Sequence, residues 1–169
     1  KSALKAIADA GGEVTGVGYG NTLIQAWLPV DMLETVATSE DVLYIRRPVE
    51  DYVDGPVDLT AFTSEGLAPM NVPAWHAAGY RGAGVRVGVL DLGFDKYRQL
   101  MGRDLPSNLV VQSFIAGVAA DQTGEVHGTA VAEIVYDIAP DAQMYLAAFQ
   151  TDVEFRMAVD WLLAQGVQI

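Results

Sequence analysis

Three short apolar segments, separated by stretches of helical or loop character, limit what this chain can fold into more than any other feature. They span residues 85–90, 109–114 and 143–149. A strand inside a parallel sheet is apolar along its length because helices cover both faces, whereas a half-exposed strand alternates apolar and polar residues. The pattern therefore predicts an α/β fold with a parallel sheet and helices on both of its faces.

Sequence signals also locate the ends of two helices in this part of the chain. Asn71 is placed to cap a helix over residues 72–78. Farther along, Thr151 and Glu154 have the spacing of a capping box, and Gly166 is placed to end the helix that they open. These helices are of the kind that an α/β fold requires.

The first 47 residues alternate helix and strand signals in the order α-β-β-α-β. Gly11 is expected to end the first helix, Pro29 to end the second strand, and Asp31 to cap the second helix. The predicted elements are residues 3–8, 13–18, 22–28, 32–37 and 42–45. We interpret this segment as a small α+β module.

Changes in sequence pattern divide the chain into three parts. Residues 1–47 form the α+β module, residues 48–70 are a proline-containing connector without periodicity, and residues 71–169 form the main domain. Residues 167–169 begin a further apolar segment, which we expect to be a strand. The chain is therefore expected to be a fragment of a longer domain.

Composition excludes several classes of function. Of the 169 residues, 51% are hydrophobic, which is enough to bury a core. The net charge of −12 repels phosphates and anionic lipids, so we expect no nucleic-acid and no membrane partner. The absence of cysteine rules out disulfides, thiolate nucleophiles and thiolate metal sites.

Two residues stand where a catalytic pair could form. Asp91 ends an apolar strand, at the edge where open parallel sheets place functional groups, and Gly93 lets the chain turn away. His127 begins a helix of small residues, and Gly128 leaves space for an approaching substrate backbone. A carboxylate bound to one imidazole nitrogen leaves the other nitrogen to accept a nucleophile's proton. We expect the two side chains to meet across a cleft.

The segments that contain Asp91 and His127 resemble those of the subtilisin-like serine proteases. Residues 91–95, Asp-Leu-Gly-Phe-Asp, are similar to the family's Asp-Thr-Gly-Ile-Asp, and residues 127–132, His-Gly-Thr-Ala-Val-Ala, to its His-Gly-Thr-His-Val-Ala. The likeness extends over residues 70–169. It implies that Asp91 is the acidic member of a catalytic triad, which orients the histidine, and that His127 is the general base. The two occur in the chain order of the family.

Some positions depart from the family pattern without touching this pair. Leu92 replaces a small hydroxyl residue, Ala130 replaces a common histidine, and Glu133 stands where glycine is frequent. These differences indicate a divergent branch.

The resemblance implies an endopeptidase that cleaves peptide or protein substrates through an acyl-enzyme, in a secreted or extracytoplasmic setting. It also implies that residues 1–47 act as a prodomain-like folding aid or inhibitor. None of the serines has the family's Gly-Thr-Ser-x-Ala setting; they are Ser2, Ser39, Ser64, Ser107 and Ser113. We therefore expect the chain to be inactive alone and to require the rest of the domain, beyond Ile169, as a partner.

Simpler interpretations compete at each position. Asp91 could cap the next turn, and His127 could face solvent. His76 is expected on the surface or in packing, and Asp95 is expected to cap the following turn, with support of the site as the alternative. We assign no metal and no cofactor, because the acidic residues near the C-terminus lack the loop spacing of a calcium site. They are Asp137, Asp141, Asp152, Glu154 and Asp160.

Two other functional classes are compatible with parts of the sequence. Gly82 and Gly84 could suggest a nucleotide site, but they precede the strand, whereas a phosphate-binding turn follows one. The stronger alternative is a non-catalytic relative that uses the same fold as a binding or assembly module.

Overall fold

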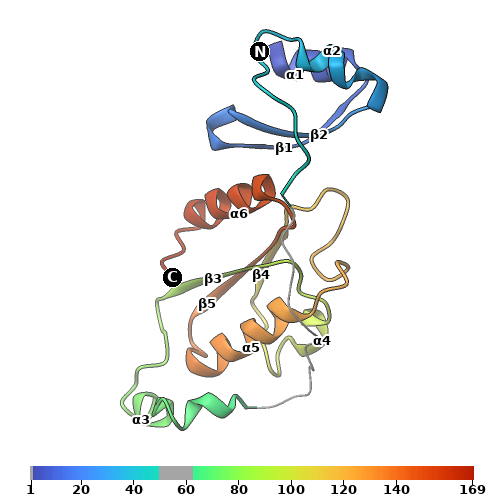
Figure 1. Ribbon diagram of the computed structural model, residues 1–169. Coiled ribbons are helices and arrows are strands. Elements are labelled where there is room, and N and C mark those ends of the chain that lie inside the picture. The colour runs from blue at the N-terminus through green and yellow to red at the C-terminus, as the bar shows by residue number, and fades with distance from the viewer. Residues whose placement is uncertain (1, 50–62) are drawn as a thin grey trace. The chain divides into compact units, whose positions relative to one another are not determined.

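The computed structural model describes residues 2–49 and 63–169, which fall into two compact units (Figure 1). The first unit comprises residues 1–51 together with 151–157, and the second comprises residues 52–150 together with 158–169. Most of the predicted connector lies outside the described residues.

The first unit contains two helices and a two-stranded antiparallel sheet. The helices are α1 (Ser2–Asp9) and α2 (Leu33–Ala37), and the strands are β1 (Glu13–Gly18) and β2 (Leu23–Trp27). Short 3₁₀ turns cover Tyr19–Asn21 and Val30–Met32. Ile7, Ala10 and Val36 form its buried centre. The first four predicted elements of this module are therefore present.

Two expectations for this module were wrong. Residues 42–45 form no strand, since they pair with neither β1 nor β2; Leu43 is 93% exposed. Asp31 does not cap a helix: it lies inside the 3₁₀ turn, and neither that turn nor α2 has a side-chain cap. The β-branched composition of residues 42–45 suits a strand, but a strand also needs a paired neighbour.

A three-stranded parallel sheet forms the centre of the second unit. Its strands are β3 (Arg86–Asp91), β4 (Val110–Ser113) and β5 (Gln143–Ala148), in the spatial order β3-β5-β4. The register pairs Asp91 with Ala148, and Ala148 with Ser113. The three carboxyl ends therefore meet at one edge. The predicted α/β class with a parallel sheet is confirmed.

Alternate residues of β5 pack into two hydrophobic clusters. Met144 and Leu146 are buried in a cluster with Ala132 of α5 (His127–Ile138). Tyr145 and Ala147 belong to a second cluster with the part of α6 (Asp152–Ala164) that contains Ala158 and Leu162. Because neighbouring residues of a strand point to opposite faces, helices cover the sheet on both sides, as Figure 1 shows.

The remaining elements of the second unit connect these layers. They are α3 (Val72–Ala77), α4 (Tyr97–Leu100) and a 3₁₀ turn at Glu65–Leu67. Asn71 is the residue before α3, as predicted, but its side chain makes no capping hydrogen bond and its φ is 58°. Residues 167–169 are not a strand, although Ile169 O accepts from Gly88 N of β3 at 2.8 Å.

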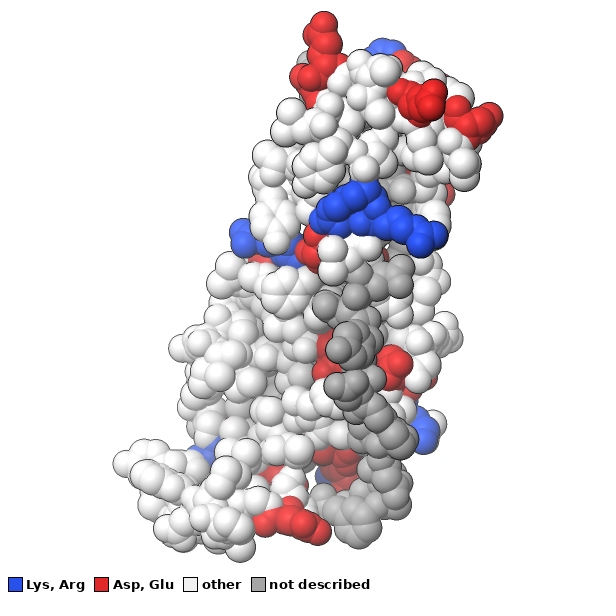
Figure 2. Space-filling view, in the orientation of Figure 1, with Lys and Arg blue, Asp and Glu red and all other residues white. Residues whose placement is uncertain are grey.

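Surface charge is spread rather than gathered on the face that Figure 2 displays, where separate acidic and basic side chains lie among uncharged ones. The exclusion of nucleic-acid partners stays a prediction. Within the described ranges, no helix has both the length and the hydropathy needed to span a bilayer.

We predict that Leu146→Ala lowers the free energy of unfolding by about 2 to 5 kcal/mol, because it opens a cavity at a fully buried position. Urea unfolding followed by far-UV circular dichroism measures this loss. Leu163→Ala, the same chemical change at a position that is 64% exposed, serves as the matched control. Its expected effect is about 0.5 kcal/mol or less. Equal losses in the two variants would contradict the described core.

Candidate active site

Asp91 is the last residue of β3 and lies at the edge where the parallel strands end. Its Oδ1 accepts a hydrogen bond from Leu92 N at 2.9 Å, so the carboxylate does bind the turn that follows the strand. Only 10% of the side chain is exposed. The second oxygen, Oδ2, points to another partner.

That partner is His127, the first residue of α5. Its Nδ1 lies 2.7 Å from Asp91 Oδ2, although the two residues are 36 positions apart in the sequence. This distance is that of a charge-assisted hydrogen bond, in which Nδ1–H donates to the carboxylate. The predicted meeting of the two side chains is observed.

The other imidazole nitrogen is open. The His127 side chain is 41% exposed, and no group in residues 2–49 or 63–169 forms a hydrogen bond with Nε2. With Nδ1–H committed to Asp91, Nε2 carries the free lone pair of the neutral ring. The pair can therefore accept a proton at Nε2, while the carboxylate stabilises the charged ring.

Main-chain hydrogen bonds join the segment after Asp91 to the segment around His127. Gly128 N donates to Gly93 O at 3.2 Å, and Asp95 N donates to Glu125 O at 2.8 Å. The hydroxyl of Thr129 donates to Asp95 O at 2.9 Å. These contacts fix how closely the strand end and the helix start approach each other.

Two glycines permit this approach because they lack side chains. A Cβ on Gly128 would lie 2.5 Å from Gly93 O and 2.6 Å from Asp91 Cβ. A Cβ on Gly93 would lie 1.7 Å from Thr123 Oγ1. The sequence had suggested a sharp turn at Gly93 and room for substrate at Gly128. The space expected for substrate at Gly128 is instead filled by the protein itself, and so is the space beside Gly93.

Asp95 does not cap the turn that follows it, so this expectation was wrong. The short helix α4 begins after Lys96 and has no side-chain cap. The carboxylate of Asp95 instead accepts hydrogen bonds from Thr123 N at 3.0 Å, Thr123 Oγ1 at 3.2 Å and Gly124 N at 3.2 Å. Thr123 and Gly124 had no distinguishing signal in the sequence, since their role depends on a partner almost thirty residues earlier.

The other residues considered from the sequence have partners of their own. His76 Nε2 is 2.8 Å from Ile138 O, in keeping with its expected structural place. Two of the acidic residues considered as calcium ligands bind protein groups. Asp137 accepts a hydrogen bond from Ser64 N, and Asp141 forms an ion pair with Arg81.

Glu133 lies on α5, the helix that His127 begins. Burial raises the pKa of the Glu133 carboxyl above its ordinary value of 4.5, and the negative charges of Asp104 and Asp137 raise it further. A proton is thus held more tightly in the folded than in the unfolded chain. The stability that this proton contributes is present at low pH and is lost as the pH rises through the raised pKa.

Comparison with known proteins supports the kinship indicated by the motifs. No protein-family model matches the chain. Over 136 residues it is 29% identical to an alkaline protease of Alkalihalobacillus alcalophilus, to an alkaline protease of Shouchella clausii and to the M-protease of Shouchella clausii strain KSM-K16. Each match covers 73% of the chain and 34% of the relative. The chain is thus a distant relative of alkaline proteases and spans about a third of their length.

We predict that Glu133→Gln raises the melting temperature at pH 7, because the ionised carboxyl is the unfavourable form in the fold. The gain should shrink as the pH falls toward 4, where the native glutamate takes up its proton. Thermal unfolding of both proteins across this range measures the difference. Glu65→Gln, at an exposed position, removes the same charge without the burial. A gain at pH 7 that persists unchanged in acid would contradict the assignment.

Proposed function

We propose that this chain is the front part of a subtilisin-like serine endopeptidase, in which Asp91 orients His127 and His127 acts as the general base. The 2.7 Å contact between Nδ1 and Oδ2, with Nε2 left open, is the observation that supports this function most directly. The similarity to alkaline proteases and the paired motifs point to the same chemistry.

In this mechanism His127 Nε2 takes the proton of an attacking serine hydroxyl and later gives it to the leaving amine. The carboxylate of Asp91 holds the imidazole in the required tautomer and stabilises its positive charge. Peptide bonds of peptide or protein substrates are cleaved through an acyl-enzyme.

We propose that the nucleophilic serine lies in the part of the protein beyond Ile169. Ser113 is the serine nearest to Asp91 in the sheet register, but β5 separates their strands. Two strand spacings separate it from Asp91 by about 10 Å, and within the described residues no hydrogen bond joins Ser113 to His127. The Ser113 hydroxyl is instead engaged by Ile115 N at 3.3 Å. The isolated chain should therefore show no peptidase activity.

In the longer protein, Asp91→Asn should lower kcat by roughly 10⁴-fold and His127→Ala by roughly 10⁶-fold, because either change leaves the serine without an effective base. Hydrolysis of a chromogenic peptide anilide measures the rate, and a serine-directed inhibitor should abolish it. His76→Gln serves as the histidine control, with a rate near that of the wild type. Activity that survives His127→Ala would refute the proposal. A longer protein with neither serine motif nor activity would favour the non-catalytic binding module.

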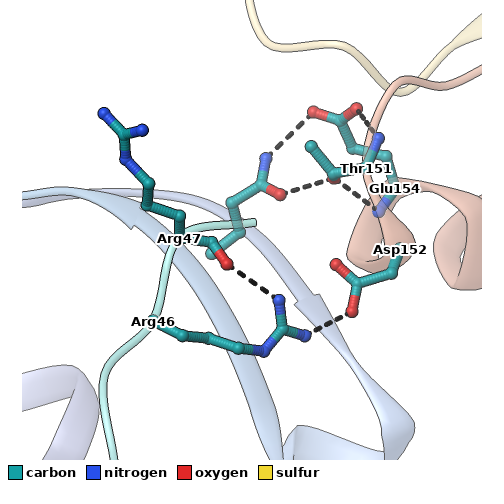
Figure 3. Close-up of polar contacts among 6 residues, drawn as sticks. Arg46, Arg47, Thr151, Asp152 and Glu154 are labelled. Atoms are coloured by element: carbon teal, nitrogen blue, oxygen red, sulfur yellow. Dashed lines mark hydrogen bonds and ion pairs between the residues drawn. The ribbon is translucent and has the colours of Figure 1, made fainter. Parts of the chain in front are cut away.

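The first unit supports a second part of the proposal: residues 1–47 act as a prodomain-like folding aid or inhibitor. Within this unit, the Gln25 side chain contacts Thr151 and Glu154 at the start of α6, two residues that Figure 3 labels. Its amide nitrogen donates to Glu154 Oε1 at 2.9 Å, and the Thr151 hydroxyl donates to its amide oxygen at 2.5 Å. Thr151 and Glu154 also form the predicted capping box, because each accepts a hydrogen bond from the other's main-chain N–H.

A second contact in the same unit joins Arg46 to Asp152 at 2.5 Å (Figure 3). Glu154 and Thr151 are buried, so the Gln25 hydrogen bonds are made where water competes little. Gln25 and Arg46 thus bind polar groups at the start of α6, within the first unit. A segment that holds a helix start in place suits a folding aid.

In the longer protein, Gln25→Ala should slow maturation by roughly tenfold, because it removes the two hydrogen bonds that the Gln25 amide makes with the buried Thr151 and Glu154 side chains. The mature enzyme should keep its specific activity. Pulse-chase analysis of precursor and product measures the maturation rate. Glu34→Ala, at an exposed position of α2, should mature at the wild-type rate. A normal rate in the Gln25 variant would remove this support for the role.

A further inference from the structure

The loop that leads into His127 has little structure of its own. Residues 119–126 contain no helix or strand, and Gly124 has a φ of 86°. Helix α5 begins without a side-chain cap, since Val126 occupies that position. We therefore attribute the path of the main chain that leads to the His127 imidazole to contacts from outside residues 119–126.

The carboxylate of Asp95 contacts this loop at Thr123 and Gly124, four and three residues before His127. One oxygen accepts from the main-chain N–H and the hydroxyl of Thr123, and the other accepts from Gly124 N. We call these contacts the Asp95 latch. Hydrogen bonds to an ionised carboxylate are stronger than bonds between neutral groups, and main-chain donors fix the path of the chain itself.

The latch also connects the two halves of the candidate site. Asp95 follows β3, the strand that Asp91 ends, and its own N–H and C=O bind Glu125 O and the Thr129 hydroxyl on either side of His127. The residue thus touches the chain both before and after the imidazole. A shift of the loop at Thr123 would be carried to the helix start, because only Glu125 and Val126 lie between Gly124 and His127.

The geometry points to Asp95 as a positioning residue that holds His127 Nδ1 against Asp91 through the loop at Thr123 and Gly124. It does not contact the imidazole. Its importance for catalysis rests on the proposed function, but its effect on the hydrogen bond between His127 and Asp91 does not.

The test measures that hydrogen bond in this chain by NMR. The chain has two histidines, so His76→Gln assigns the ring signals. In the wild type, the Nδ1 proton of His127 should give a downfield resonance that exchanges slowly with water. In Asp95→Ala we expect this proton to exchange faster by about tenfold or more, because a loop that loses its charged acceptor opens more often.

Three further variants separate positioning from general loosening. Asp95→Asn retains one carbonyl acceptor and should restore part of the protection. Thr123→Val removes the hydroxyl, which donates to Asp95 and accepts from Glu125 N, but keeps both main-chain donors to Asp95, and it should have an intermediate effect. Asp121→Ala breaks the ion pair of the same loop with Arg98 but leaves the latch intact, so it should leave the resonance unchanged. Far-UV circular dichroism and melting temperature show that each variant is folded.

Exchange within about twofold of the wild type in folded Asp95→Ala would overturn the inference, since a latch that matters must slow opening by more than this. An equal disturbance in Asp121→Ala would overturn it as well, because the effect would then belong to the loop as a whole. Should Asp95→Ala fail to fold, the decision falls to Asp95→Asn and Thr123→Val, and wild-type exchange in both counts against the latch. Failure of the proposed peptidase activity would show in the longer protein and would leave these measurements intact.

Discussion

The candidate site depends on the hydrogen bonds that join the turn after β3 to the chain around His127. The parallel register alone brings Asp91 to the edge of the sheet, but it does not bring an imidazole there. Main-chain contacts from Gly93 and Asp95 to Gly128 and Glu125 supply the second half of the arrangement. The 2.7 Å contact between His127 Nδ1 and Asp91 Oδ2 depends on both the strand register and these main-chain hydrogen bonds.

The exposure of the two side chains suits the roles proposed for them. Asp91 is largely withdrawn from water, which strengthens its interaction with the imidazole. His127 keeps its outer nitrogen accessible, so a group arriving from the solvent side could exchange a proton with it. A buried carboxylate that orients a reachable imidazole is the arrangement of the Ser-His-Asp mechanism.

Local signals in the sequence were enough to predict much of the fold. Apolar runs located β3, β4 and β5, and the capping box at Thr151 and Glu154 located the start of α6. The prediction failed for residues 42–45, because strand formation depends on a neighbour and not on composition alone. It failed for the caps at Asp31 and Asn71, because a suitable residue type does not ensure a hydrogen bond.

The sequence anticipated the contact between Asp91 and His127 through motifs, but not the means by which it is held. The partners of Asp95 lie 28 and 29 positions away, so no local pattern could reveal them. The absence of a side chain at Gly93 likewise has meaning only once Thr123 is placed beside it.

The hydroxyl of Thr123 occupies the space that a side chain at Gly93 would fill. Any side chain at position 93 would displace Thr123, which binds Asp95 in the loop that leads to His127. The spacing between the carboxylate and the imidazole therefore depends on an atom that the chain leaves out.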